Sequence, residues 1–330
     1  MKILRWMVPL ALALAGVWPA GIAAGQESPS QFPSRLIKLI VPYPPGGGVD
    51  GLARPIAERL GRLWGQSVII ENKPGAATMI GGAEVAHAPA DGHTLLFTSD
   101  STVTSNPHLF KKMLYDPIRE LAPVTQLIDL HQFVLVHPSV SANTMKELVA
   151  LTKEKPDALN YGSYGKGSQP HLLFEMLDKE TGAKIQQISY RGIAPAITAV
   201  LTGEVQTTLG SVAVAAGHIE ARKLKALAIG RQARLPSHPE IPTLREAGFP
   251  DIEPLSWFGL FAPAGTPPAI VAQIQQAVAA VLNEPEFKAR FIYQAGHSGV
   301  GSTPAAFAAF IQADLEAKQK LIAAAGIEAE

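Results

Sequence analysis

The sequence predicts an α/β fold made of two similar units, and three observations support this fold class. Apolar runs rich in β-branched residues alternate with stretches of helical spacing along most of the chain, which is the pattern of strands connected by helices. A strand, a glycine-rich loop and a helix follow one another once in each half. The 330 residues are also enough chain for two domains of ordinary size.

The first unit begins with the apolar run 36–41, which predicts a strand. Prolines and glycines at 42–48 then turn the chain, and helical spacing follows at 51–64. The other elements expected in this half are a strand at 68–71, a small-residue helix that ends near residue 87 and a strand at 94–98.

The second unit repeats this cycle from the apolar run 133–136. The helices expected in it lie at 144–155, 171–181 and 194–202, and the strands lie at 159–162, 185–190, 206–209 and 224–229. A proline-rich segment at 236–242 predicts a rigid surface connection. After the apolar run 257–262, two long amphipathic stretches predict helices at 269–282 and 304–325.

The first 25 residues are predicted to be an export signal and not part of the fold. Lys2 and Arg5 come before the apolar run 6–15, and small residues at 20–25 precede a polar stretch. Charged, apolar and small-residue parts in this order make up a secretory signal peptide, and the apolar run is short for a membrane span. We expect cleavage after Gly25, or else after Ala23, and a periplasmic mature protein. A buried N-terminal helix is the alternative.

Composition excludes several classes of function. The 28 basic residues balance the 28 acidic residues, whereas proteins that bind nucleic acid usually carry a basic excess. The chain has no cysteine, which excludes disulfide scaffolds, thiol nucleophiles and zinc sites built from cysteine. Its nine histidines include neither a pair at i, i+4 nor an H-E-x-x-H motif. We therefore expect neither a metal ion nor a nucleic-acid partner.

The local motifs do not predict a catalytic site. Residues 46–51 match the dinucleotide pattern G-x-G-x-x-G between a strand and a helix, and Glu71 lies where a ribose-binding acid is expected. Two prolines widen this turn, however, and NAD is a cytoplasmic cofactor. Residues 296–300 lack the last glycine of a nucleophile elbow, and residues 165–168 lack the spacing of a phosphate-binding P-loop. We expect a binding protein without a cofactor; a secreted α/β hydrolase or oxidoreductase is the alternative.

Two glycine-rich loops, 43–48 and 163–168, favour a site for an anionic ligand. Glycine lets backbone N–H groups point into a concavity, and the N-terminus of the following helix adds partial positive charge. Ser99, Asp100 and Thr102 follow the third strand at its carboxyl end, where open α/β sheets place their ligands. Alternatively, the glycines only close tight turns and the two hydroxyl side chains cap a helix. Asp50 is expected to stabilise the N-terminus of its own helix.

These segments resemble the periplasmic solute receptors of tripartite tricarboxylate transporters, the Bug-type receptors, over essentially the whole mature chain. The matching segments are VPYPPGGGVD at 41–50, VIIENKPGA at 68–76, ADGHTL at 90–95, NYGSYGKGS at 160–168, YRG at 190–192, PTLREAGF at 242–249, WFG at 257–259 and APAGTP at 262–267. No single segment is specific, but their number and order are.

The resemblance implies a type II periplasmic-binding-protein fold, in which two α/β lobes with mixed sheets enclose a ligand cleft and close by a hinge motion. Lobe 1 would comprise residues 26–130 and 254–330, and lobe 2 would comprise residues 131–253. The chain would then cross between the lobes near Leu130 and near Pro254.

The resemblance also implies a monomer that binds a small organic carboxylate and delivers it to the membrane subunits of a tripartite tricarboxylate-type transporter. A sensor protein for signalling is the alternative partner. The candidate ligand contacts are Tyr43, Gly46, Gly47, Gly48, Ser99, Asp100, Thr102, Gly165, Gly167, Ser168, His171, Arg191, Gly192 and Ser211. Val49 stands where the family often has a hydroxyl side chain, and Gln206 replaces a frequent aspartate, which argues against recognition of an ammonium group.

Overall fold

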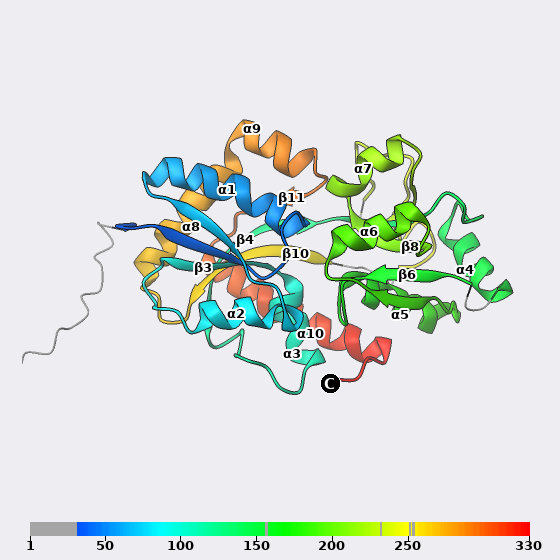
Figure 1. The fold of residues 1–330 in the computed structure, drawn as a ribbon, viewed down its shortest axis with the longest axis horizontal. Helices are drawn as coiled ribbons and strands as arrows, with labels where there is room; N and C mark the ends of the chain where they lie inside the picture. The colour runs from blue at the N-terminus through cyan, green and yellow to red at the C-terminus, as the bar shows by residue number, and fades with distance from the viewer. Residues whose placement is uncertain (1–31, 156–157, 232, 251, 253–254) are drawn as a thin grey trace, which may run out of the picture.

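The computed structural model describes residues 32–155, 158–231, 233–250, 252 and 255–330. Two mixed β-sheets lie side by side, and helices cover both of them (Figure 1). The predicted α/β fold with two mixed sheets is thereby confirmed. The predicted signal peptide at 1–25 lies outside the described residues. Within the described part of the chain, no helix has both the length and the apolar character that a membrane crossing requires.

The first sheet has six strands in the order β11-β4-β10-β3-β1-β2. Its strands are β1 (Ile37–Val41), β2 (Val68–Asn72), β3 (Thr94–Ser99), β4 (Leu121–Leu130), β10 (Ser256–Pro263) and β11 (Ser298–Gly299). The strands β1, β2 and β3 are parallel, whereas β10 is antiparallel to both β3 and β4. Strands from the two ends of the chain therefore share one sheet.

The second sheet has five strands in the order β7-β6-β8-β5-β9. Its strands are β5 (Gln132–Val136), β6 (Asn160–Ser163), β7 (Gln186–Ser189), β8 (Thr207–Ser211) and β9 (Lys225–Ile229). The strand β6 is parallel to β7 and β8, and β5 is antiparallel to β8 and β9. The strands of the first sheet thus come from residues 37–130 and 256–299, and those of the second from 132–229.

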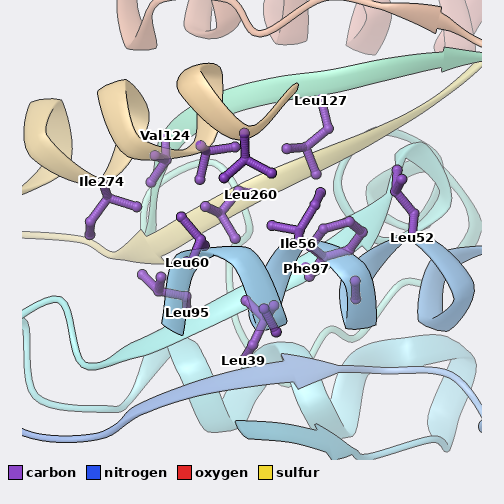
Figure 2. Close-up of a cluster of buried hydrophobic side chains, with 14 of the residues drawn as sticks. Leu39, Leu52, Ile56, Leu60, Leu95, Phe97, Val124, Leu127, Leu260 and Ile274 are labelled. Carbon is purple, nitrogen blue, oxygen red and sulfur yellow. The ribbon is translucent and has the colours of Figure 1, made fainter. Parts of the chain in front are cut away.

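Helices pack on both faces of each sheet because alternate strand residues point to opposite faces. Leu39, Leu95 and Phe97 pack against α1 and α8 on one face of the first sheet, as Figure 2 shows. Ile40 and Leu96 join the core on the other face, next to α2 and α10. The helices are α1 (Gly48–Trp64), α2 (Met79–Ala86), α3 (Asn106–Leu109), α4 (Met145–Glu154), α5 (Gln169–Thr181), α6 (Ile193–Thr202), α7 (Val212–Glu220), α8 (Pro268–Asn283), α9 (Pro285–Phe287) and α10 (Pro304–Ala325), with the short turns η2 (Ala76–Thr78), η3 (Ser101–Ser105) and η4 (Lys288–Tyr293).

The carboxyl edges of the two sheets face each other where the chain crosses directly from one sheet to the other. The strand β4 ends at Leu130, and β5 begins at Gln132. Because β4 runs in the same direction as β3, its end lies at the edge where β1 and β3 also end. The start of β5 pairs with the end of β8, so it lies at the carboxyl edge of the second sheet. The predicted lobe boundaries remain predictions, and Pro254 lies outside the described residues.

Several elements were not predicted from the sequence, and some helices begin earlier than predicted. The strand β4 carries Pro123, which argues against a strand in the middle of a sheet. Here β11 pairs with β4 only at its far end, and the pairing with β10 is irregular beside the proline, so that the missing N–H is tolerated. The helix α7 was also missed. The helix α1 begins at Gly48 and not at residue 51, and α5 begins at Gln169 and not at residue 171.

Candidate ligand-binding site

Hydroxyl groups from three segments are hydrogen-bonded to one another at the carboxyl edge of the first sheet. The phenol oxygen of Tyr43, after β1, lies 2.7 Å from Ser99 Oγ at the end of β3 and 3.4 Å from Thr102 Oγ1. Thr102 Oγ1 lies 2.6 Å from Thr98 Oγ1 and donates to Thr78 Oγ1 at 2.8 Å. The structure therefore brings together three predicted contacts, Tyr43, Ser99 and Thr102.

The turn that carries Thr78 is strained. Gly75, Ala76, Ala77 and Thr78 all have positive φ angles, of 129°, 45°, 48° and 77°, a region that residues with a Cβ seldom adopt. Asn106 Nδ2 donates to the Ala77 carbonyl at 2.7 Å and helps to hold this conformation. Such strain concentrates at functional sites. The sequence signal for this turn was weak, because three of its four residues are not glycine.

The first glycine-rich loop ends in the first turn of α1. Asp50 is buried and accepts hydrogen bonds from Gly46 N–H at 2.9 Å, from Arg54 at 2.8 Å and from Asn72 at 3.0 Å. Burial alone would raise the pKa of Asp50, but these hydrogen bonds outweigh it and hold the pKa below its ordinary value. The predicted role of Asp50 at its own helix end is confirmed, and Gly46 N–H already has an acceptor.

The donors that remain at this end of α1 are the N–H groups of its first turn. Gly47 is the N-cap residue, with φ −77° and ψ 173°, and Gly48 is the first residue of the helix. The N–H groups of a first turn have no acceptor within their helix, and the partial charge there is positive. Gly47 and Gly48 therefore lie at a helix N-terminus that favours an anion, which is the kind of ligand predicted for this loop.

The second glycine-rich loop is closed by its own hydrogen bonds. Gly165 N–H donates to Ser163 Oγ at 3.2 Å, Gly167 N–H donates to His171 Nδ1 at 2.8 Å, and Ser168 Oγ donates to the Gly165 carbonyl at 2.6 Å. Burial, together with the charge of Lys166, lowers the pKa of His171 to about 4, so the imidazole is neutral and can accept. A ligand contact with either glycine amide would require the loop to give up one of these bonds.

Tyr164, at the tip of this loop, faces the first sheet. Burial raises the pKa of its phenol, and the negative charge of Asp100 and the nearby Tyr43 raise it further, whereas hydrogen bonds from the Gln169 backbone and the Gln132 side chain act in the opposite direction. The phenol is therefore protonated at neutral pH and remains a donor. Tyr164 lies in the matching segment 160–168 but was not among the candidates; its place beside Gly165 in the glycine-rich loop was the available signal.

Asp100 joins the two sheets and is not a free anion. Its Oδ2 lies 2.8 Å from Lys318 Nζ and accepts from Gln169 Nε2 at 2.6 Å, and its Oδ1 accepts from Ser256 Oγ at 2.7 Å. Lys318 and Gln169 also donate to the Leu255 carbonyl, at 2.8 Å and 2.9 Å. Asp100 was predicted from the sequence, but its partners were not, because they come from three distant segments.

The remaining candidates, Arg191, Gly192 and Ser211, belong to the part of the chain that forms the second sheet. Arg191 is exposed, and within the described residues no ion pair involves it. Gly192 is the N-cap residue of α6, and Ser211 is the N-cap residue of α7. Ser211 is only 5% exposed. It lies opposite Gln132 at the carboxyl edge of the second sheet, close to the chain crossing.

Comparison with known proteins connects this arrangement to one family. A family model described as the tripartite tricarboxylate transporter family receptor matches residues 52–327. Protein BugT of Bordetella pertussis is 33% identical over 308 residues, which cover 92% of this chain and 94% of that protein.

Solved structures show the same fold. The periplasmic binding protein BugD superposes with a TM-score of 0.85 at 29% identity, covering 91% of this chain and 100% of that one. A protein of R. palustris solved with adipate has a TM-score of 0.87 at 31% identity, with 91% and 100% coverage. MatC from Rhodopseudomonas palustris, with bound malate, has a TM-score of 0.83 at 29% identity, with 88% and 100% coverage. The expected periplasmic-binding-protein fold is confirmed.

Proposed function

The chain belongs to the receptors of the tripartite tricarboxylate transporter family, and we propose that it captures a small organic carboxylate in the periplasm and hands it to such a transporter. The family consists of periplasmic solute-binding proteins, not of enzymes. Two relatives solved with ligands hold adipate and malate, both of which are dicarboxylates. A dicarboxylate is therefore the ligand class that we propose for this chain.

The observation that carries the proposal is that the first turn of α1 and the hydroxyl cluster of Tyr43, Ser99 and Thr102 lie at the same carboxyl edge of the first sheet: a Cβ at Gly48 would lie 3.6 Å from Phe258, the residue of β10 that pairs with Ser99. Backbone N–H groups and the helix N-terminus favour a carboxylate without a basic side chain. The hydroxyl groups at the end of β3 can rotate to donate to the same anion. Arg191 is exposed, which supports a mechanism that does not depend on an ion pair with this residue.

The lobe that carries Tyr164 would supply the second wall of the site. Its phenol is a protonated donor near Tyr43, and Asp100 and Gln169 link the two sheets beside it. A ligand held between the lobes would then draw them together by a hinge motion, each lobe moving as a rigid body.

Calorimetric titration tests this proposal directly. The unliganded protein should bind at least one of succinate, glutarate and adipate, and should not bind the corresponding diols, which have the same chain length but no carboxylate. Small-angle scattering should show a smaller radius of gyration at saturation. Binding of a diol as tightly as of its diacid would contradict carboxylate recognition. Loss of uptake of the bound diacid in a deletion strain, restored by the gene, would support the transporter over a sensor as partner.

A further inference from the structure

Two buried polar side chains face each other at the carboxyl edge of the second sheet. Gln132 of β5 and Ser211 of β8 are directly opposite partners in an antiparallel pair, so their side chains lie on the same face. They share this face with Val134 and Leu209, which pack against α5. Gln132 is 2% exposed and Ser211 is 5% exposed.

These side chains present polar atoms that the described protein leaves without a partner. Neither Gln132 Oε1 nor Ser211 Oγ has a hydrogen bond within the described residues, and both atoms are buried. Buried polar atoms in folded proteins are nearly always hydrogen-bonded, and an acceptor that is buried unpaired destabilises the fold. Two such atoms on one face, beside the proposed ligand site, indicate that something outside the protein binds there.

The contacts of Gln132 define what its free oxygen requires. Its side-chain amide donates to the phenol of Tyr164, which leaves Oε1 as an acceptor without a donor. The phenol oxygen, having accepted this bond, can still donate its own proton. The Gln132 oxygen therefore needs a hydrogen-bond donor, which a carboxylate does not have.

Ser211, unlike Gln132 Oε1, can donate a hydrogen bond. It is the N-cap residue of α7, a helix of nine residues, and its side chain makes no capping bond. Its hydroxyl can donate, and the N-terminus of α7 favours negative charge. A donor pair, Ser211 and Tyr164, thus lies next to one acceptor, Gln132 Oε1.

We propose that these residues form a second subsite that binds the far carboxylate of the ligand and selects for a hydroxyl group beside it. Ser211 and Tyr164 donate to the carboxylate, and Gln132 Oε1 accepts from the hydroxyl. The preferred ligand is then a hydroxy-substituted dicarboxylate, which binds more tightly than the unsubstituted diacid of the same length. This inference rests on the proposed function and narrows its substrate class.

Matched ligand pairs test the subsite. Each pair has one chain length, with and without a 2-hydroxyl group: malate with succinate, 2-hydroxyglutarate with glutarate, and 2-hydroxyadipate with adipate. Dissociation constants are measured by calorimetry for the wild-type protein, for Gln132→Met and for a control, Gln126→Met. Gln126 is also buried, but its amide donates to Asp129 within the first sheet. Circular dichroism first confirms that both variants are folded.

In the pair of the best length, the wild-type protein should favour the hydroxy acid by about tenfold or more, because a site built to bind a hydroxyl group disfavours the analogue that lacks it. Gln132→Met should reduce this preference to less than about threefold, mainly by weakening the hydroxy acid, and Gln126→Met should leave it unchanged. Equal binding of the two wild-type ligands, or equal weakening of both by Gln132→Met, would overturn the subsite while leaving carboxylate binding intact. If no diacid of either series binds, the proposed function itself is wrong, and the inference falls with it.

Discussion

Asp100 and Lys318 form a buried ion pair, with 2.8 Å between Oδ2 and Nζ and with 1% and 3% of their side chains exposed. Lys318 belongs to α10, near the C-terminus, whereas Asp100 follows β3. Gln169, the first residue of α5, donates to the same carboxylate oxygen. The last helix of the chain is thereby tied both to the first sheet and to the glycine-rich loop of the second.

Removal of one partner of this buried pair should lower the free energy of unfolding far more than removal of one partner of a surface ion pair. Lys318→Met leaves the buried Asp100 carboxylate without its cation, and we expect a loss of about 3–5 kcal/mol in the free energy of unfolding. Arg35→Ala, which breaks the exposed pair with Asp91, should cost about 1 kcal/mol or less. Urea denaturation of both variants measures the difference. Equal losses would show that the buried pair contributes no more than a surface contact.

The first residue of α1 offers a test of the amide site in which the fold is little disturbed. Gly48→Pro removes one N–H group at a helix position that suits proline, and Gly47 before it already has the extended conformation that proline requires of its neighbour. Gly48→Ala keeps the N–H group, and the added Cβ would lie 3.6 Å from Phe258, an ordinary contact.

If the ligand carboxylate accepts from Gly48 N–H, Gly48→Pro should weaken binding about ten- to a hundredfold, whereas Gly48→Ala should weaken it much less. Calorimetric titration with the tightest diacid separates the two. Arg191→Ala should have only a small effect, since this side chain is exposed. Normal binding by Gly48→Pro together with loss of binding by Arg191→Ala would replace the amide site with an ion pair.

Substitution of Gly167 by a residue with a side chain should destabilise the protein, because Gly167 packs closely against Leu109 of α3. Its φ angle is +70°, and a Cβ there would come within 1.8 Å of Leu109 Cδ1 on α3. Gly182 is the matched control, with a φ angle of +72° and open space around it. Gly182→Ala should cost about 1–2 kcal/mol through backbone strain alone.

Gly167→Ala should cost more than this control and should enlarge the radius of gyration in small-angle scattering, because α3 and the loop must move apart. The double variant Gly167→Ala with Leu109→Ala should regain the smaller radius. The contact would be unimportant for the lobe arrangement if Gly167→Ala scattered like the wild-type protein.

The neutral His171 should make stability fall in mild acid. Burial and the charge of Lys166 lower its folded pKa from 6.5 to about 4, while the unfolded chain takes up its proton near the ordinary value. Between pH 6.5 and 4 the unfolded state therefore binds more protons, so stability is complete above this window and is lost as the pH falls through it. The slope that one group contributes is at most about 1.4 kcal/mol per pH unit.

His171→Asn keeps an acceptor for Gly167 N–H but does not titrate. Its free energy of unfolding should therefore fall less steeply than that of the wild-type protein over the same window. Denaturation at several pH values gives both slopes, and identical slopes would mean that His171 does not titrate differently in the folded and unfolded states.

The prediction of the fold from sequence succeeded where the signal was local. The apolar runs of β1 and β3, the helical spacing of α1 and α10 and the turn residues between them each lie within one short segment. Two elements whose sequences do not favour one conformation were not predicted. The strand β4 contains a proline, and α7 follows β8 with no turn residue between them. Their conformation depends on neighbours from other parts of the chain.

The predicted site divides in the same way. Ser99 and Thr102 were predicted because open α/β sheets expose the residues that follow their parallel strands, whereas Tyr43 was predicted because its loop resembles that of the receptor family. The glycines were found as well, but the structure shows that Gly46, Gly165 and Gly167 already donate within the protein. Whether the N–H group of a glycine is free depends on nearby side chains such as His171, and the pattern of glycines does not predict where those side chains lie.

The class of the protein can be read from its residues alone: an α/β chain with two glycine-rich strand-to-helix loops, no cysteine and the ordered segments of one receptor family. Which side chains contact one another depends on how the chain is assembled in three dimensions. Lys318 reaches Asp100, and Gln132 lies opposite Ser211, because strand order and the crossing at Leu130 bring distant segments to one edge. Periodicity records how each segment relates to its own neighbours, whereas these pairs depend on how whole sheets are assembled, and no short stretch of sequence carries that information.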